Sequence, residues 1–79
     1  MVYSLDRMKK DVDSLLQKLG AQIKAERKSR KLTQTQLGEL AETGINFISQ
    51  IEAGKPTAQI GKVLRVLQIL GFEVKVERR

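Results

Sequence analysis

Apolar side chains recur every three or four residues in successive segments of this chain, and this spacing restricts the fold more than any other feature. The pattern begins in residues 4–19 and returns in residues 34–41, 45–53 and 57–71. Such spacing places the apolar side chains on one face of an α-helix. The single proline, Pro56, lies between the last two segments. We therefore expect an all-α protein in which each helix buries one apolar face.

The first apolar stripe leaves two arrangements open. Ser4 is a suitable helix cap, and the apolar positions continue from Leu5 as far as Ile23. Asp13 or Ser14 could cap a new helix, so we expect two helices here, with one long helix as the alternative. Thr33 is the expected cap of the helix over residues 34–41, and Thr57 that of the helix ending at Gly71. The total is about five helices.

Length and composition exclude most catalytic chemistry. The chain has 79 residues and no Cys or His, so disulfides, thiolate zinc sites and a histidine base are excluded. We expect no enzyme, no metal and no cofactor. A net charge of +6 favours an acidic partner, either nucleic acid or an anionic membrane. No apolar run spans a bilayer and no signal peptide is evident, which predicts a soluble cytoplasmic protein without a membrane.

The C-terminal segment has a different period. Apolar and charged residues alternate from Phe72 through Val74 and Val76, which is typical of a β-strand. A lone strand has no partner within a helical chain, so we expect it to pair with the same strand of a second copy, making a homodimer. A frayed terminus is the alternative.

Two short segments at the centre of the chain have the features of a DNA-reading unit. Residues 34–41 and 45–53 are joined by the turn Glu42-Thr43-Gly44, and Gly38 allows close crossing. The inner faces carry four apolar residues, Leu37, Ala41, Ile48 and Ile51. The outer face of the second segment carries Asn46, Ser49 and Gln50, whose polar side chains suit base edges.

Residues 32–57, LTQTQLGELAETGINFISQIEAGKPT, resemble the Xre/Cro–CI phage-repressor class of helix-turn-helix domains. The string NFISQIEAGKPT with a trailing strand is most similar to HipB-type antitoxins. This resemblance implies a compact lambda-repressor-like domain over residues 19–71. Residues 1–18 would then form a helical extension, and residues 72–79 a dimerisation strand.

The resemblance also implies which residues contact DNA. Base-facing positions correspond to Ile45, Asn46, Ser49 and Gln50. Phosphate-contacting positions correspond to Thr33, Gln34, Lys55 and Thr57. Asn and Gln bond adenine and an exposed Ile suits a thymine methyl, so we expect a preference for A·T pairs. Alternatively, the amides are polar surface. Phe47, an aromatic residue at helical spacing, is expected to pack inside the protein, with DNA contact as its alternative.

An ion pair between Arg27 and Glu52 is implied by the same resemblance, with two solvated side chains as the alternative. The basic run Lys24–Lys31 is either a solvated face or a phosphate-contacting patch. Lys31 and Glu42 stand where the family usually has glycine, and Gly44 replaces the usual Ser or Thr cap. These departures concern turn geometry.

The sequence thus predicts a transcriptional repressor that binds a palindromic operator in double-stranded DNA as a homodimer. The HipB-type likeness further implies an antitoxin that sequesters a HipA-like kinase toxin. The competing hypothesis is a protein- or membrane-interaction module that uses a basic amphipathic helix.

Overall fold

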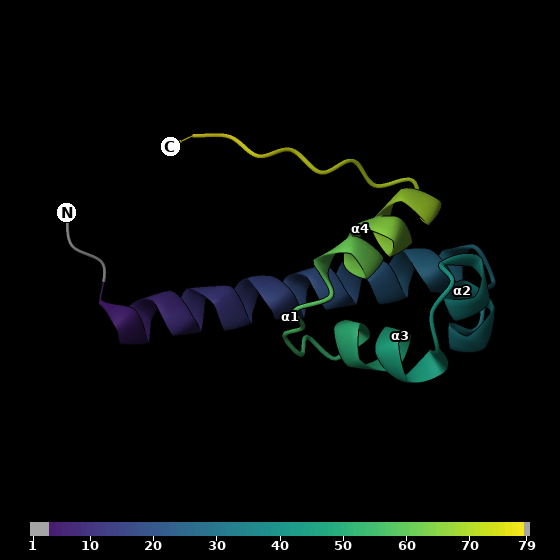
Figure 1. The fold of residues 1–79 in the computed structure, drawn as a ribbon, viewed down its shortest axis with the longest axis horizontal. Helices are drawn as coiled ribbons and strands as arrows, with labels where there is room; N and C mark the ends of the chain where they lie inside the picture. Colours follow the sequence, from purple (N-terminus) through teal and green to yellow (C-terminus); the bar gives the residue numbers. More distant parts are fainter. Residues whose placement is uncertain (1–3, 79) are drawn as a thin grey trace.

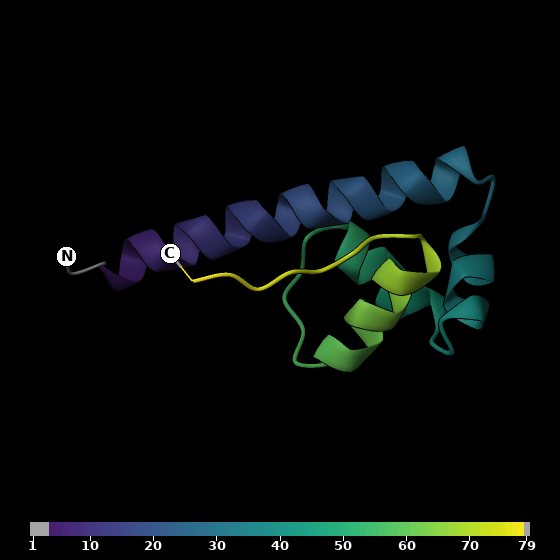
Figure 2. The ribbon, with the colours of Figure 1, turned by 90° about the horizontal axis from the view of Figure 1, so that it is seen from above.

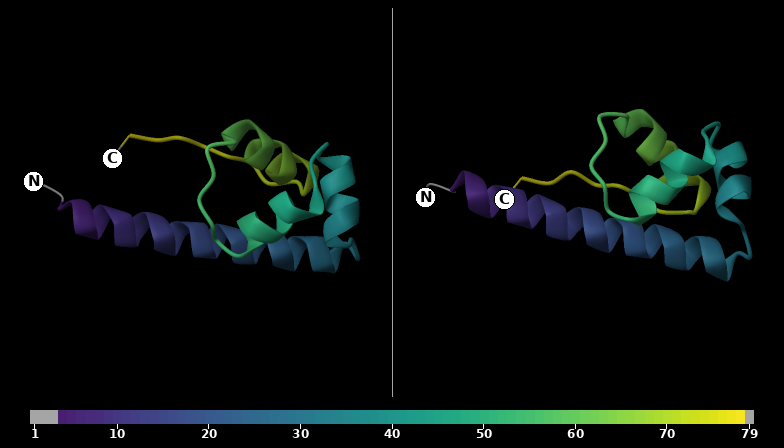
Figure 3. Two further views of the ribbon diagram at one scale, coloured as in Figure 1. Left: turned by 60° about the horizontal axis from the view of Figure 1, so that its bottom comes forward. Right: turned by 90° about the horizontal axis from the view of Figure 1, so that it is seen from below.

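The computed structural model describes residues 4–78, which contain four α-helices. These are α1 (Leu5–Ser29), α2 (Gln34–Leu40), α3 (Ile45–Glu52) and α4 (Ile60–Ile69). Figure 1 shows α2, α3 and α4 gathered against the C-terminal half of α1, while the N-terminal half extends beyond them. The further views in Figure 3 show the same arrangement from below. The molecule is elongated, with extents of 44 × 23 × 21 Å.

The first apolar stripe forms one continuous helix of 25 residues, so the expectation of two helices here, and of about five in total, is wrong. Ser4 caps α1, because its side-chain oxygen accepts a hydrogen bond from the Arg7 backbone N–H at 3.2 Å. Asp13 and Ser14 lie exposed within the helix. An exposed Asp or Ser side chain can point into water without breaking the backbone ladder, so neither residue ends the helix.

The start of α2 and the turn into α3 follow from local chemistry. The Thr33 hydroxyl accepts from the Gln36 backbone N–H at 3.0 Å, and Gln36 Oε1 accepts from the Thr33 N–H at 2.8 Å. This reciprocal pair is a capping box. Glu42 takes the left-handed conformation with φ 56°, as does Lys31 with φ 58°. Two side-chain-bearing residues thus occupy backbone positions that favour glycine.

Thr57 does not cap α4, which begins two residues later than expected, at Ile60. The Thr57 hydroxyl accepts instead from the Gln59 backbone N–H at 3.1 Å. This short-range bond is a turn that holds residues 57–59 outside the helix. Gly71 ends α4 in the left-handed region, with φ 81°.

Residues 72–78 form extended chain, and residues 4–78 contain no β-strand. The expected strand is therefore absent from the single chain, because an extended segment needs a neighbour to complete its hydrogen bonds. Phe72 is half-buried against the core, whereas the side chains of Val74 and Val76 are exposed. Figures 1 and 2 show this C-terminal segment running back towards the N-terminal end of α1.

The core lies between the C-terminal half of α1 and the other three helices. Its buried apolar residues are Ile23, Leu37, Ala41, Ile48, Ile51, Val63, Val66, Leu67 and Leu70. Leu40, which the spacing places with Leu37, is 56% exposed instead. Close backbone approach occurs at two small residues. A Cβ added at Gly20 would lie 2.6 Å from the Glu52 carbonyl oxygen, and one at Gly38 would lie 2.9 Å from that of Thr43.

Substituting Gly20 by alanine should destabilise the protein by about 1–3 kcal/mol, because the added methyl group meets the α3 backbone and forces α1 and α3 apart. Chemical unfolding followed by circular dichroism measures this change. Gly61→Ala is the matched control, since a Cβ at Gly61 meets nothing within 4 Å. The control should be neutral or gain up to about 1 kcal/mol from helix propensity. Equal effects of the two substitutions would contradict the close packing at Gly20.

Candidate nucleic-acid interface

The outer face of α3 presents polar side chains to solvent above an apolar underside. Ile48 is fully buried and Ile51 is 6% exposed. On the other side of the helix, the exposed residues are Ile45, Asn46, Ser49 and Gln50. The four sequence-predicted base-facing residues therefore lie together on one accessible helix face. The buried isoleucines fix the rotation of α3 about its axis, and so fix which side chains point outwards.

The turn between α2 and α3 holds the two helices at close range. The Thr43 backbone N–H donates to the Gly38 carbonyl at 2.7 Å. Gly44 is the N-cap residue of α3, and because glycine has no side chain it makes no capping hydrogen bond. Leu37 on α2 and Ala41, the residue directly after α2, are fully buried. The α2–α3 pair is therefore a helix-turn-helix unit with a short, hydrogen-bonded turn.

A buried ion pair attaches α3 to α1. Arg27 Nε donates to Glu52 Oε2 at 2.6 Å, and its Nη2 donates to Oε1 at 3.1 Å. The third guanidinium nitrogen, Nη1, donates to the Leu32 carbonyl at 2.8 Å. The two side chains are only 9% and 3% exposed. The bidentate geometry matches the fork of a guanidinium to a carboxylate and leaves neither charge unpaired.

The predicted phosphate-contacting residues differ in their surroundings. Thr33, Lys55 and Thr57 are exposed. Gln34 is half-buried, and its Nε2 donates to Glu52 Oε1 at 3.2 Å. Residues 33 and 34 begin α2, whereas residues 55 and 57 follow the end of α3. These residues thus border the helix-turn-helix unit at two points.

Two basic residues of α4 contact the unit, and the sequence analysis did not identify them. Arg65 Nη1 donates to the Ala41 carbonyl at 3.1 Å, at the C-terminal end of α2. Lys62 Nζ lies 5.8 Å from the centre of the Phe47 ring, within the range of a cation–π contact. Phe47 itself is half-buried against the core, which agrees with packing. In the sequence, the spacing of Lys62 and Arg65 by three residues indicates that both lie on one face of a helix, but not which residues they contact.

Neither metal chemistry nor a membrane span is found in the described part of the chain. Residues 4–78 contain no cluster of three acidic, His or Cys side chains that could hold a metal ion. None of the helices in the same range combines the length and apolarity needed to cross a bilayer.

Arg27→Ala should lower the free energy of unfolding by about 3–5 kcal/mol, because it leaves the buried Glu52 carboxylate without its cation. Thermal and chemical denaturation measure the loss. Arg27→Lys should have a smaller effect, since it keeps the charge but loses the bidentate fork. Lys28→Ala, which removes a positive charge from the neighbouring exposed position, should change stability by no more than about 0.5 kcal/mol. Similar effects at positions 27 and 28 would rule out the structural role of the pair.

Comparison with known proteins agrees with this geometry. A family model described as "Helix-turn-helix domain" matches residues 18–79. The chain is 50% identical over 58 residues to the uncharacterized HTH-type transcriptional regulator y4mF of Sinorhizobium fredii, covering 73% of this chain and 76% of that protein. The structure is similar to the crystal structure of the restriction-modification controller protein C.AhdI from Aeromonas hydrophila. That match has a TM-score of 0.69 and 22% identity, and it covers 80% of this chain and 91% of the other. The chain belongs to the helix-turn-helix family of transcriptional regulators.

Proposed function

We propose that this chain is a repressor that reads double-stranded DNA with α3 in the major groove. The observation that carries the proposal is the outer face of α3, where Asn46 and Gln50 are exposed above the buried Ile48. Each amide can bond an adenine bidentately. Ile45 is 48% exposed at the start of the same helix and suits a thymine methyl. The operator should therefore be rich in A·T pairs at the contacted positions.

Phosphate contacts supply most of the affinity in this proposal. Thr33, Lys55 and Thr57 are exposed residues that border the helix-turn-helix unit, and the chain has a net charge of +6. Gln34 donates a hydrogen bond to Glu52, so in this proposal it holds α2 against α3 as well as contacting phosphate. Release of counterions from DNA makes such binding strongly dependent on salt.

The active form in this proposal is a homodimer on a palindromic operator. The exposed Val74 and Val76 lie in extended chain beyond the half-buried Phe72, which suits pairing with the same segment of a second copy. Two-fold symmetry would place two copies of α3 in successive major grooves about 34 Å apart.

The likeness of residues 46–57 to HipB-type antitoxins supports a more specific role. In this role the protein represses its own operon in the cytoplasm and sequesters a HipA-like kinase toxin. Size-exclusion chromatography of the chain mixed with a HipA-like kinase encoded beside its own gene tests the pairing. Elution of the chain and the kinase in two separate peaks would contradict the antitoxin role and leave a repressor that acts without a toxin partner.

Gln50→Ala should weaken binding to an operator selected from randomised duplex DNA by about 5- to 100-fold, because one bidentate base contact is lost. Fluorescence anisotropy with selected and scrambled duplexes measures the change. Affinity for the scrambled duplex should stay constant. Gln68→Ala is the control, since Gln68 is an exposed amide on α4. A selection that yields no inverted repeat and no A·T enrichment would contradict the proposed function.

Lys55→Ala should weaken binding to both duplexes by a similar factor, because a phosphate contact carries no sequence information. The plot of log K against log salt concentration should become shallower by about one unit. Lys10→Ala removes the same charge from the exposed N-terminal half of α1 and serves as the control. An unchanged salt slope for the Lys55 variant would remove that residue from the interface.

A further inference from the structure

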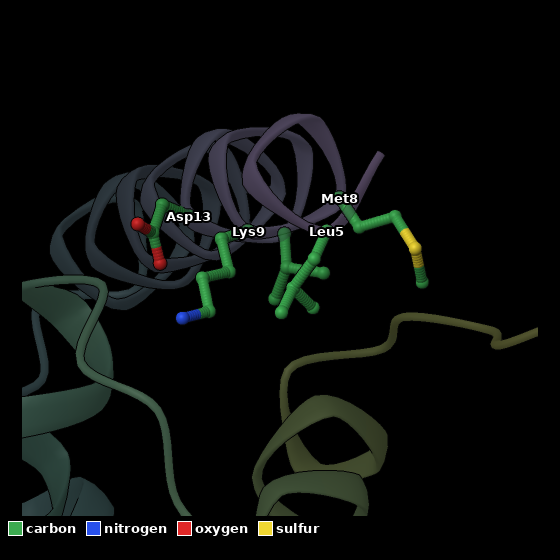
Figure 4. Close-up of a pocket in the computed structure, with 5 residues that line it drawn as sticks. Leu5, Met8, Lys9 and Asp13 are labelled. Atoms are coloured by element: carbon green, nitrogen blue, oxygen red, sulfur yellow. The ribbon is translucent and has the colours of Figure 1, made fainter. Parts of the chain in front are cut away.

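The N-terminal half of α1 carries an apolar stripe that stays exposed among residues 4–78. Leu5 is 65% exposed, Met8 46%, Val12 52% and Leu15 63%. In Figure 4 the side chains of Leu5 and Met8 project from α1 towards the side occupied by α4 and the C-terminal segment. A shallow pocket of about 350 Å³ lies along this stripe, lined by Leu5, Met8, Lys9, Val12 and Asp13. An exposed apolar stripe of this kind on a helix is typical of a surface that contacts another protein.

The stripe has the spacing of a two-stranded coiled coil. Apolar residues occupy positions 5, 8, 12, 15 and 19, which alternate in steps of three and four like the a and d positions of a heptad. The face of α1 buried against its own domain is centred on Gly20, Ile23 and Arg27, and Leu19, at the end of the stripe, is half-buried against the same core. At 100° per residue, the two faces are separated by roughly 70° around the helix. A second helix can therefore pack on the exposed residues Leu5, Met8, Val12 and Leu15, and it reaches the domain at Leu19.

Charge indicates what kind of partner covers the stripe. Residues 4–16 contain three acidic and three basic side chains, so the whole net charge of +6 belongs to the rest of the chain. This balance gives no attraction to nucleic acid or to an anionic membrane. A protein surface with the same mixture of charges is the complementary partner, and a second copy of this segment has that mixture.

We propose that α1 pairs with α1 of a second copy in an antiparallel orientation, with the two-fold axis between residues 13 and 14. In this register, Val12 lies opposite the partner's Leu15, and Met8 lies opposite the partner's Leu19. Asp11 then flanks the seam beside the partner's Lys18, and symmetry repeats the attraction on the other side. A parallel pair would instead place Asp11 beside the partner's Leu16, with no opposite charge.

This pairing deepens the proposed dimeric regulator, on which it rests, by naming the surface that joins the two copies. The rise of 1.5 Å per residue separates the two Ile23 residues by about 30 Å along the helix pair, the same order as one turn of DNA. The 70° offset places both domains on the same side of the pair. The C-terminal segment runs back towards the same end of the molecule (Figures 1 and 2).

Sedimentation equilibrium of the full chain without DNA tests the proposal. The unmodified protein should be dimeric, and Leu15→Glu should weaken self-association by at least about 100-fold, because it places a carboxylate in the seam. Ser14→Glu makes the same charge change on an exposed position outside the stripe, and it should remain dimeric. Circular dichroism verifies that each variant keeps its helices. Equal association of the two variants would overturn the proposal.

A charge swap tests the antiparallel register. Asp11→Lys and Lys18→Asp alone should each weaken the dimer by about tenfold, since two attractions become two repulsions. The double variant should regain most of the original affinity. A double variant that is as weak as the single variants would overturn the register, because loss of helix stability gives no rescue.

Val74→Asp separates this proposal from the proposed function. Loss of the dimer on Val74→Asp with no loss on Leu15→Glu would overturn α1 pairing while leaving a dimer joined by the C-terminal segment. A monomeric unmodified protein that still binds an inverted repeat as two copies would also overturn α1 pairing, while the DNA-reading role stands. A protein that pairs through α1 but selects no DNA sequence would support α1 pairing and overturn the DNA-reading role.

Discussion

The carboxylate of Glu52 is the contact on which the arrangement of the first three helices depends. It belongs to α3, it accepts two hydrogen bonds from Arg27 on α1, and it accepts a third from Gln34 on α2. The Glu52 side chain is only 3% exposed, so its charge has little contact with water and requires these donors. Three helices therefore meet at one anion, and the orientation of α3 is fixed at the end opposite to its exposed Asn46.

Features that depend on neighbouring residues were predictable from the sequence. Ser4 and Thr33 cap helices through bonds to backbone groups three residues away, and Gly71 ends α4 with a positive φ. The apolar spacing of residues 45–52 identified Ile48 and Ile51 as buried, and hence the opposite face as exposed. Short-range geometry fixes each of these results, so a single sequence contains the necessary information.

Features that depend on distant parts of the chain were not predictable in the same way. Nothing near Gly20 in the sequence indicates that the α3 backbone passes against it, and nothing near Arg65 indicates the Ala41 carbonyl. One helix continues through residues 13 and 14 because their exposed side chains do not disrupt its backbone hydrogen bonds. The capping preference of Asp and Ser therefore could not distinguish one helix from two. The alternation in residues 72–77 predicted a β-strand, whereas residues 72–78 form extended chain without strand pairing, because a strand requires a neighbour.

The continuity of α1 has a mechanical consequence. A single helix of 25 residues carries the protruding apolar segment at one end and Arg27, the anchor of α3, near the other. The helix is continuous through Gly20, which packs closely on the α3 backbone, so a tilt imposed on its first turns is transmitted along the helix to the far end. A partner bound to residues 5–16 would therefore change the orientation of α3, the helix that carries Asn46 and Gln50, although the two surfaces are not in contact.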